Sequence, residues 1–409
     1  MLRANRADFD LRGLARGADM IRTLAIAVTG LGLAFAGTSG ASAADPVRIG
    51  FSLPLTGIFA PAAPSQKNAY ELWRDQVNAS GGLDVAGTKR PVEFVMYDDQ
   101  SDPGQGAKIY EKLIVEDKVD LLLGPWGTPH HVAVAGVLER HKFPMVGDTA
   151  ASVILRGMKP GYIWFPTSAL PDEMGKQLPL LLKSQGVKTV AITTAQHPFS
   201  LENKKFIVEG LKANGIQVVS DAEYPLDIRD MTALITAAKA SNPDAELSLS
   251  LTGDSVLYMR QSKELGFTPR VQYMLVGPAA TFFTKIFGDQ LEGLLTMGHW
   301  SPSQKTWPKA KPFYDAYVAK YQEPPDYLDS SLSYEACEIL QQAVAKVGLD
   351  HEKLRQTFAT DTFDTIDGPV KFSGVVNVTT PTMFLQYQKG VYEIVWPKSV
   401  ATAEIIARK

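Results

Sequence analysis

The sequence predicts an α/β protein made of two doubly wound halves, each a mostly parallel sheet covered by helices. Apolar strand patterns alternate with helical patterns of about ten to fifteen residues, which is typical of βαβ units. The same alternation begins again after Pro166 and Thr167. A length of 409 residues with no block of like charge fits a globular protein of two or more domains.

The first 44 residues have the pattern of a secretory signal peptide. Arg22 precedes an apolar run, Leu24–Phe35, and small residues then end in Ala41-Ser42-Ala43-Ala44. A basic region, a short hydrophobic core and an A-x-A site define such a peptide, and the run is too short for a membrane span. Met20 is a more typical start, so residues 1–19 are interpreted as an upstream extension. We therefore expect a periplasmic protein that is not inserted in the membrane after cleavage.

Composition argues against several classes of function. Removing residues 1–44 leaves 36 basic and 41 acidic residues of the 41 and 44 in the full chain, a net charge near −5. This balance argues against a nucleic acid or an anionic membrane as partner. The single cysteine, Cys337, lies in a helical pattern and is expected to be a buried small residue rather than a nucleophile.

The elements follow from periodicity and from glycine and proline breaks. In the first half we predict strands and helices, in chain order, over Val47–Leu53, Ser65–Val77, Val92–Tyr97, Gln105–Glu116, Val119–Leu123, Pro129–Arg140, Pro144–Gly147 and Tyr162–Phe165. The second half continues the alternation over Pro171–Gln185, Thr189–Thr194, Leu201–Asn214, Gln217–Tyr224, Asp230–Ser241, Leu247–Leu251, Ser255–Leu265, Tyr273–Val276 and Leu294–Gly298. Three helices and a hairpin complete the chain, over Lys309–Tyr321, Leu328–Val347, His351–Ala359, Met383–Gln388 and Val391–Trp396.

The stretch from Val119 to His131 is the clearest candidate for a binding site. It predicts a buried strand, a Gly-Pro-Trp-Gly loop and a helix with Thr128 as N-cap and Pro129 as its first residue. The unpaired amides and positive dipole of a helix start can hold a carboxylate. Trp126 would add a flat apolar wall. An ordinary strand-to-helix turn with a packing tryptophan explains this stretch equally well.

Four segments in a fixed order resemble one family of exported binding proteins. They are Val47–Gly57 (VRIGFSLPLTG), Asn78–Gly82 (NASGG), Tyr97–Pro103 (YDDQSDP) and Leu123–Pro125 (LGP). Over the whole mature chain, the sequence resembles type I periplasmic solute-binding proteins of the leucine/isoleucine/valine-binding family, which serve branched-chain amino acid-type ABC importers. The resemblance implies two Rossmann-like lobes joined by a three-crossover hinge.

The same resemblance implies where the lobes meet and which residues bind. The crossovers are expected near Phe165–Ala169, Thr296–Trp300 and Phe363–Lys371, giving one lobe of residues 45–167 plus 299–366 and another of 168–298 plus 367–409. Thr128 matches the hydroxyl that holds the ligand carboxylate, Phe199 an aromatic lying over the ligand, and Ala62 a position that often carries a bulky aromatic. The full set of predicted ligand-binding residues is Trp126, Thr128, Ala150, Ala151, Ser152, Phe199, Ala62, Thr252, Asp254, Ala279 and Trp300.

One departure from the family bears on the ligand. The acidic residue that pairs with a ligand ammonium usually follows Gly277-Pro278, where this chain has Ala279. Burying an ammonium without a carboxylate partner costs several kcal/mol. Asp254 or Glu202 could substitute. Together with the aromatic residues, this favours an aromatic or aliphatic carboxylate or amide over an unmodified amino acid, with a true branched-chain amino acid as the alternative.

An enzyme is the first competing interpretation. Asp98, Asp99 and Asp102 could be general acids or metal ligands, but an Asx-capped, solvated turn fits their Asp-x-x-Pro-Gly setting better. His130 and His131 are adjacent on a helix, point about 100° apart and cannot easily chelate one metal, although one could face the cleft. His197 could rim the pocket. No catalytic or cofactor motif is present in the mature chain, so no enzyme, cofactor or metal is expected.

The second competing interpretation is a sensor with the same fold. A liganded protein of this kind could present its lobes to a receptor kinase instead of a permease. We expect a monomer that binds a small molecule by hinge closure and delivers it to an inner-membrane ABC permease.

Overall fold

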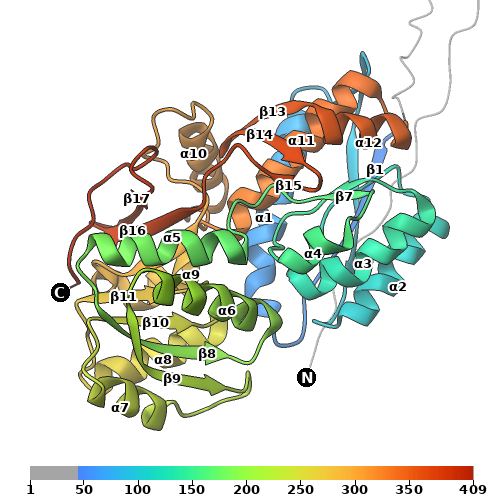
Figure 1. The fold of residues 1–409 in the computed structure, drawn as a ribbon. Coiled ribbons are helices and arrows are strands. Elements are labelled where there is room, and N and C mark those ends of the chain that lie inside the picture. Colours follow the sequence, from blue (N-terminus) through green and yellow to red (C-terminus); the bar gives the residue numbers. More distant parts are fainter. Residues whose placement is uncertain (1–44, 409) are drawn as a thin grey trace, which may run out of the picture. The chain divides into compact units, whose positions relative to one another are not determined.

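The larger sheet is built mainly from the second half of the chain. The computed structural model describes residues 45–408, so the predicted signal peptide, residues 1–44, lies outside the described residues. Seven strands pair in the order β17-β16-β12-β11-β10-β8-β9, and the last five of these run parallel to one another (Figure 1). The strands are β8 Thr189–Ala195, β9 Gln217–Tyr224, β10 Ala245–Leu249, β11 Val271–Met274, β12 Leu295–Gly298, β16 Met383–Gln388 and β17 Val391–Trp396.

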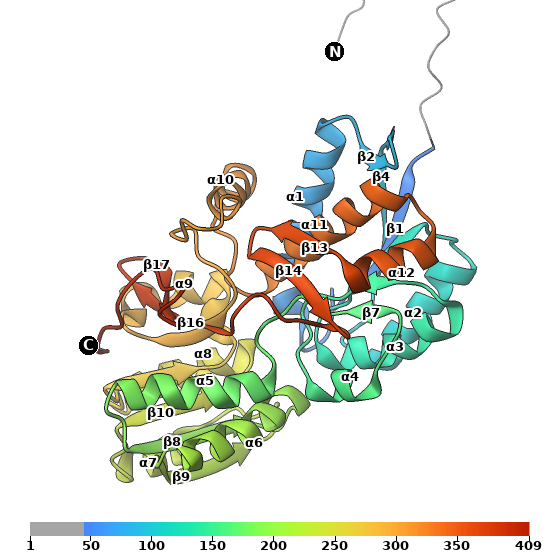
Figure 2. The ribbon, with the colours of Figure 1, turned by 45° about the horizontal axis from the view of Figure 1, so that its top comes forward.

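Helices cover both faces of this sheet. Helices α5 and α6 pack on each other along one face, as Figure 2 shows. Helices α7 and α8, which connect β9 to β10 and β10 to β11, pack against each other. Gly175 and Gly210 permit the close approach of α5 and α6, because a Cβ on either would collide with backbone of the other helix. The helices are α5 Pro171–Ser184, α6 Pro198–Ala213, α7 Thr232–Ala240, α8 Thr252–Glu264 and α9 Thr281–Phe287.

The first half of the chain forms a second parallel sheet in two pieces. Strands pair in the order β4-β1-β5, a bridge from Leu123 to Val146 connects β5 to β6, and β6 pairs with β7. The apolar core on one face comes from α1, α11 and α12, and the core on the other from α2 and α3. These elements are β1 Val47–Leu53, β4 Val92–Asp98, β5 Leu121–Leu122, β6 Met145–Val146, β7 Ile163–Trp164, α1 Ala63–Ala79, α2 Pro103–Val115, α3 Thr128–His141, α4 Val153–Met158, α11 Asp329–Val347 and α12 His351–Thr360.

The predicted two-fold alternation of strands and helices is therefore confirmed, while several short elements were not predicted. These are the hairpin β2 Leu83–Val85 and β3 Thr88–Arg90, helices α4 and α9, and strands β13 Thr362–Thr365, β14 Gly368–Ser373 and β15 Val376–Asn377. Most are too short to give a clear period in the sequence.

The pairing of the short strands β13, β14 and β15 favours a third crossover later in the chain than predicted. Strands β13, β14 and β15 form an antiparallel sheet, and a bridge from Val376 to Phe165 attaches it to the first-half strands. The chain enters the seven-stranded sheet only at Met383. We therefore propose that the third crossover falls at residues 378–382 rather than at Phe363–Lys371, because the Phe363–Lys371 segment pairs within its own small sheet.

Helix α10, Ala310–Tyr321, was expected in the first lobe but packs against the seven-stranded sheet. Its Ala310, Phe313 and Tyr317 belong to the apolar core of the seven-stranded sheet. We therefore propose that the second lobe extends through α10. The residues that follow α10, up to residue 377, then belong to the first lobe. No helix within residues 45–408 combines the length and apolar character that a bilayer span requires.

Candidate functional site

The loop after β5 is fixed by contacts that only glycine allows. At Gly124 a Cβ would collide with the Asp148 carboxylate and the His131 ring. Gly127 has φ +85°, in the left-handed region that favours glycine, and turns the chain into α3. The backbone conformation of residues 124–127 is therefore restricted, and it determines where α3 begins.

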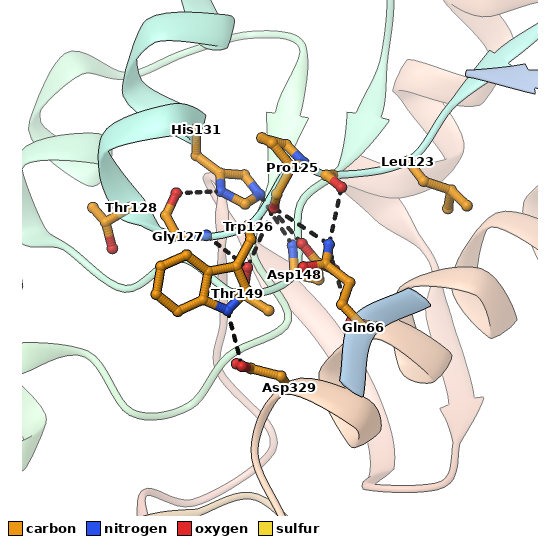
Figure 3. Close-up of polar contacts among 12 residues, drawn as sticks. Gln66, Leu123, Pro125, Trp126, Gly127, Thr128, His131, Asp148, Thr149 and Asp329 are labelled. Atoms are coloured by element: carbon orange, nitrogen blue, oxygen red, sulfur yellow. Dashed lines mark hydrogen bonds and ion pairs between the residues drawn. The ribbon is translucent and has the colours of Figure 1, made fainter. Parts of the chain in front are cut away.

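The buried carboxylate of Asp148 fixes this loop through a network of hydrogen bonds (Figure 3). Its Oδ2 accepts from Gln66 Nε2 at 2.7 Å, Tyr70 Oη at 2.6 Å and Ser333 Oγ at 2.9 Å. Gln66 Nε2 also donates to Gly124 O at 3.0 Å. Three elements distant in sequence, α1, β6 and α11, are therefore tied to the loop through one carboxylate.

Helix α3 begins one residue earlier than predicted. Gly127, not Thr128, is its N-cap, so Thr128 and Pro129 occupy the first two helical positions. The predicted cap is wrong because the left-handed turn at Gly127 leaves Thr128 already helical. The Thr128 hydroxyl instead accepts from Ala151 N at 3.1 Å, which joins the helix start to the Ala150–Ala151 segment.

A cavity of about 60 Å³ opens beside this helix start. Both halves of the chain contribute to its wall, which is mostly aliphatic and aromatic. The lining residues are Trp126, Gly127, Thr128, Thr149, Ala150, Ala151, Thr167, His197, Phe199, Leu251, Val276, Met297, His299, Leu328, Asp329 and Leu332.

The cavity has no positively charged wall. No lysine or arginine is among the lining residues, and its two histidines are uncharged near neutral pH. Burial lowers the pKa of His197 to about 4 and that of His299 to about 3. His197 Nδ1 accepts from Phe199 N at 3.3 Å, while His299 Nε2 has no hydrogen-bond partner within residues 45–408. An anion here must be held by backbone amides and neutral donors.

Asp329 is a cavity residue that the sequence analysis did not single out. It is the first residue of α11, and its Oδ2 accepts from Trp126 Nε1 at 2.9 Å (Figure 3). Burial and the nearby Asp326 carboxylate raise its pKa well above the usual range. Asp329 meets Trp126 from a distant part of the sequence, so no local pattern indicated that it would line the cavity.

The predicted binding residues fall into three groups. Five of them line the cavity: Trp126, Thr128, Ala150, Ala151 and Phe199. Three others, Ala62, Thr252 and Asp254, line an adjoining hollow of about 80 Å³ that shares Trp126 and Leu251 with the cavity. Asp254 Oδ2 there accepts from Tyr224 Oη at 2.7 Å.

The remaining three do not reach the cavity. Trp300 is fully buried, stacks on Tyr327 and donates to Asp326 O, so it is a core residue. Ala279 is buried, and Ser152 caps α4 by accepting from Ile154 N. An aromatic residue after a buried strand can face either the core or a cleft, and the local sequence does not distinguish the two.

The histidine and aspartate clusters have structural surroundings. His130 and His131 are both buried, 3.4 Å from Asp99 and Asp148 respectively, so the expectation that one faces the cleft is not met. Asp102 caps α2 as predicted, but Asp99 is buried rather than solvated. No group of three or more potential metal ligands occurs in the part of the chain that the structure describes.

Comparison with known proteins identifies the family. A family model described as periplasmic binding protein matches residues 46–390. The chain belongs to this family. Leu/Ile/Val-binding protein homolog 8 of Brucella suis is 25% identical over 404 residues, covering 93% of this chain and 97% of the relative. These matches place the chain among type I binding proteins of the Leu/Ile/Val-binding group, which bind solutes and are not enzymes.

Solved structures agree on the fold. The branched-chain amino acid transporter substrate-binding protein LivJ of Streptococcus pneumoniae, in complex with isoleucine, has a TM-score of 0.77 at 21% identity, over 86% of this chain and all of LivJ. A solute-binding protein of Rhodopseudomonas palustris, in complex with benzoate, has a TM-score of 0.75 at 20% identity, over 88% and 98%. The chain therefore shares the fold of these solute-binding proteins.

Proposed function

We propose that this protein captures a small carboxylate or amide with an apolar or aromatic body in the periplasm and delivers it to an inner-membrane ABC permease. The cavity carries the proposal, because aromatic and aliphatic walls adjoin the amides at the start of α3 and no cationic side chain is present. Backbone amides at a helix start can hold a carboxylate without a basic residue. The benzoate complex of the Rhodopseudomonas palustris protein supports a ligand of this class.

An α-ammonium group fits this cavity poorly. In an amino acid the ammonium lies next to the carboxylate, so its partner must lie near Thr128. Asp329 is the one carboxyl among the lining residues, and Figure 3 places it on the far side of the Trp126 indole from Thr128. Asp254 already accepts from Tyr224. An unpaired buried ammonium costs several kcal/mol.

Binding is expected to couple to hinge closure. Two contacts join the lobes beside the cavity: Val153 N donates to Glu202 Oε1 at 3.2 Å, and Arg156 pairs with Asp172 at 2.7 Å. A ligand held on α3 would be covered by Phe199 from the other lobe. Closure excludes water and strengthens each hydrogen bond to the ligand. A receptor kinase that binds the same closed form is the alternative partner.

Thermal unfolding with candidate ligands tests the ligand class. A ligand at about 100 times its Kd stabilises the folded state by about 2.7 kcal/mol. We expect benzoate or a related acid to raise the melting temperature and leucine or isoleucine at the same concentration to leave it unchanged. A strong response to leucine, with none to aromatic acids, would show that a true amino acid is the ligand.

A further inference from the structure

We infer that Asp329 is a specificity-determining residue that binds a hydrogen-bond donor, such as a hydroxyl, on the end of the ligand remote from its carboxylate. The inference rests on the proposed function and names the ligand class more closely: a hydroxylated aromatic acid rather than a plain one. The fold makes little use of this carboxyl, and the cavity wall includes it.

The start of α11 is capped by a different aspartate. Asp326 Oδ1 accepts from Ser330 N at 2.6 Å and from Leu328 N at 3.2 Å. Asp329 follows within the same turn but takes no part in this capping. Trp126 Nε1 is the one hydrogen-bond donor to its side chain within residues 45–408. Its carboxyl is therefore surplus to the helix.

Keeping this carboxyl in the wall costs free energy. Asp329 is 8% exposed, and the other carboxylates near it, those of Asp326 and Asp148, are also buried. One neutral indole N–H compensates little of the desolvation of an acidic group. Burial and the nearby Asp326 carboxylate raise the pKa of Asp329. In either protonation state an oxygen remains that can accept a hydrogen bond.

Two polar groups at the α3 end of the cavity have hydrogen-bond partners within the protein. Gly127 N donates to Thr149 Oγ1 at 2.9 Å, and the Thr128 hydroxyl bonds Ala151. Figure 3 places Asp329 and Thr128 on opposite sides of the Trp126 indole, against which a flat ring could lie. A ring carrying a carboxylate at one end and a hydroxyl at the other would meet the α3 amides and Asp329 together.

Matched ligands separate the hydroxyl from the ring. Isothermal titration of the mature protein with 4-hydroxybenzoate and 4-methylbenzoate compares a donor with an apolar group of similar size. We expect at least tenfold tighter binding of the hydroxylated acid. A site built to hydrogen-bond a hydroxyl rejects an analogue that lacks it.

Variants assign the effect to Asp329. In Asp329→Leu the preference for 4-hydroxybenzoate over 4-methylbenzoate should disappear, while 4-methylbenzoate still binds. Asp329→Asn keeps an acceptor oxygen and should retain part of this preference. Glu335→Gln is the control, because Glu335 is another buried carboxyl of α11 that does not line the cavity. It should leave the preference unchanged.

The outcomes distinguish this inference from the proposed function. Equal binding of the two acids by the unmodified protein, or a preference that survives Asp329→Leu, overturns the role of Asp329 and leaves aromatic-acid binding intact. Failure of every aromatic acid to bind overturns the proposed function and the inference together. Binding of leucine that is lost in Asp329→Asn would instead make Asp329 the partner of an ammonium.

Discussion

At the scale of single residues, Thr128 shows how a predicted residue can keep its place and acquire another role. It lies at the cavity as expected, but its hydroxyl bonds Ala151 N instead of capping its own helix. Its contribution to binding is therefore partly positional, because it holds the helix start and the Ala150–Ala151 segment in one arrangement.

Thr128→Ala should weaken ligand binding at least tenfold. Hydrogen bonds that involve a charged group contribute about 1.5–3 kcal/mol, and tenfold corresponds to about 1.4 kcal/mol. Isothermal titration with the ligand found by the thermal screen measures the loss, and circular dichroism checks the fold. Thr128→Ser, which keeps the hydroxyl, should bind nearly as well as the original. Unchanged affinity in Thr128→Ala would remove Thr128 from the site.

At the scale of elements, Asp148 connects α1, β6 and α11 under the loop that leads into α3. It is completely buried and accepts three side-chain hydrogen bonds at 2.9 Å or less. Gly124 and Gly127 give this loop no side chains to pack at those positions, so the path of its backbone depends on this carboxylate. The binding surface is thus positioned by residues that do not touch the cavity.

Asp148→Ala should lower the free energy of unfolding by about 3–5 kcal/mol, as expected when one partner of a buried charged network is removed. Urea unfolding measures the change. Asp315→Ala is the control, since Asp315 is exposed and forms only a surface pair with Lys311. Its loss should cost less than about 1 kcal/mol. A similar small effect at both positions would contradict the role given to Asp148.

At the scale of the whole molecule, the cavity wall to which both halves of the chain contribute contains a buried, uncharged histidine. His299 follows β12, lies 3.4 Å from the hydroxyl of Ser168, which precedes α5, and donates its backbone N–H to Tyr327 O. Charging it would place an uncompensated cation in this cavity wall.

This histidine should make the folded state less stable in acid. Its pKa is about 3 in the folded protein and about 6.5 when unfolded, so between these values the unfolded chain binds more protons. Stability is therefore complete above pH 6.5 and is lost as the pH falls. From pH 7.5 to 5.0 the loss from His299 should be about 2 kcal/mol.

Comparing the unfolding free energy of the original protein with that of His299→Gln at both pH values isolates this contribution from the buried acids, which act in the opposite direction. The gap between the two proteins should change by about 2 kcal/mol between the two pH values. Parallel pH profiles would show that His299 does not titrate in this way.

Local sequence determined the repeated elements of both halves: the bounds of β1, β9 and the β16–β17 hairpin agree with the predicted ranges, and most helices differ by only a few residues. Period and glycine or proline breaks are properties of short stretches, so they can be read without the fold. The motif order likewise indicated the family, and the strand-to-helix stretch around Thr128 indicated one wall of the cavity.

Tertiary structure alone decided which side chains face the cavity. Trp126 and Trp300 both follow buried strands, yet one lines the cavity and the other packs on Tyr327. Asp329 meets Trp126 across 203 positions of sequence, and strands β13, β14 and β15 pair in a small sheet of their own that was not predicted. The direction in which a side chain faces depends on which distant element packs against it, and that information is not contained in any local stretch.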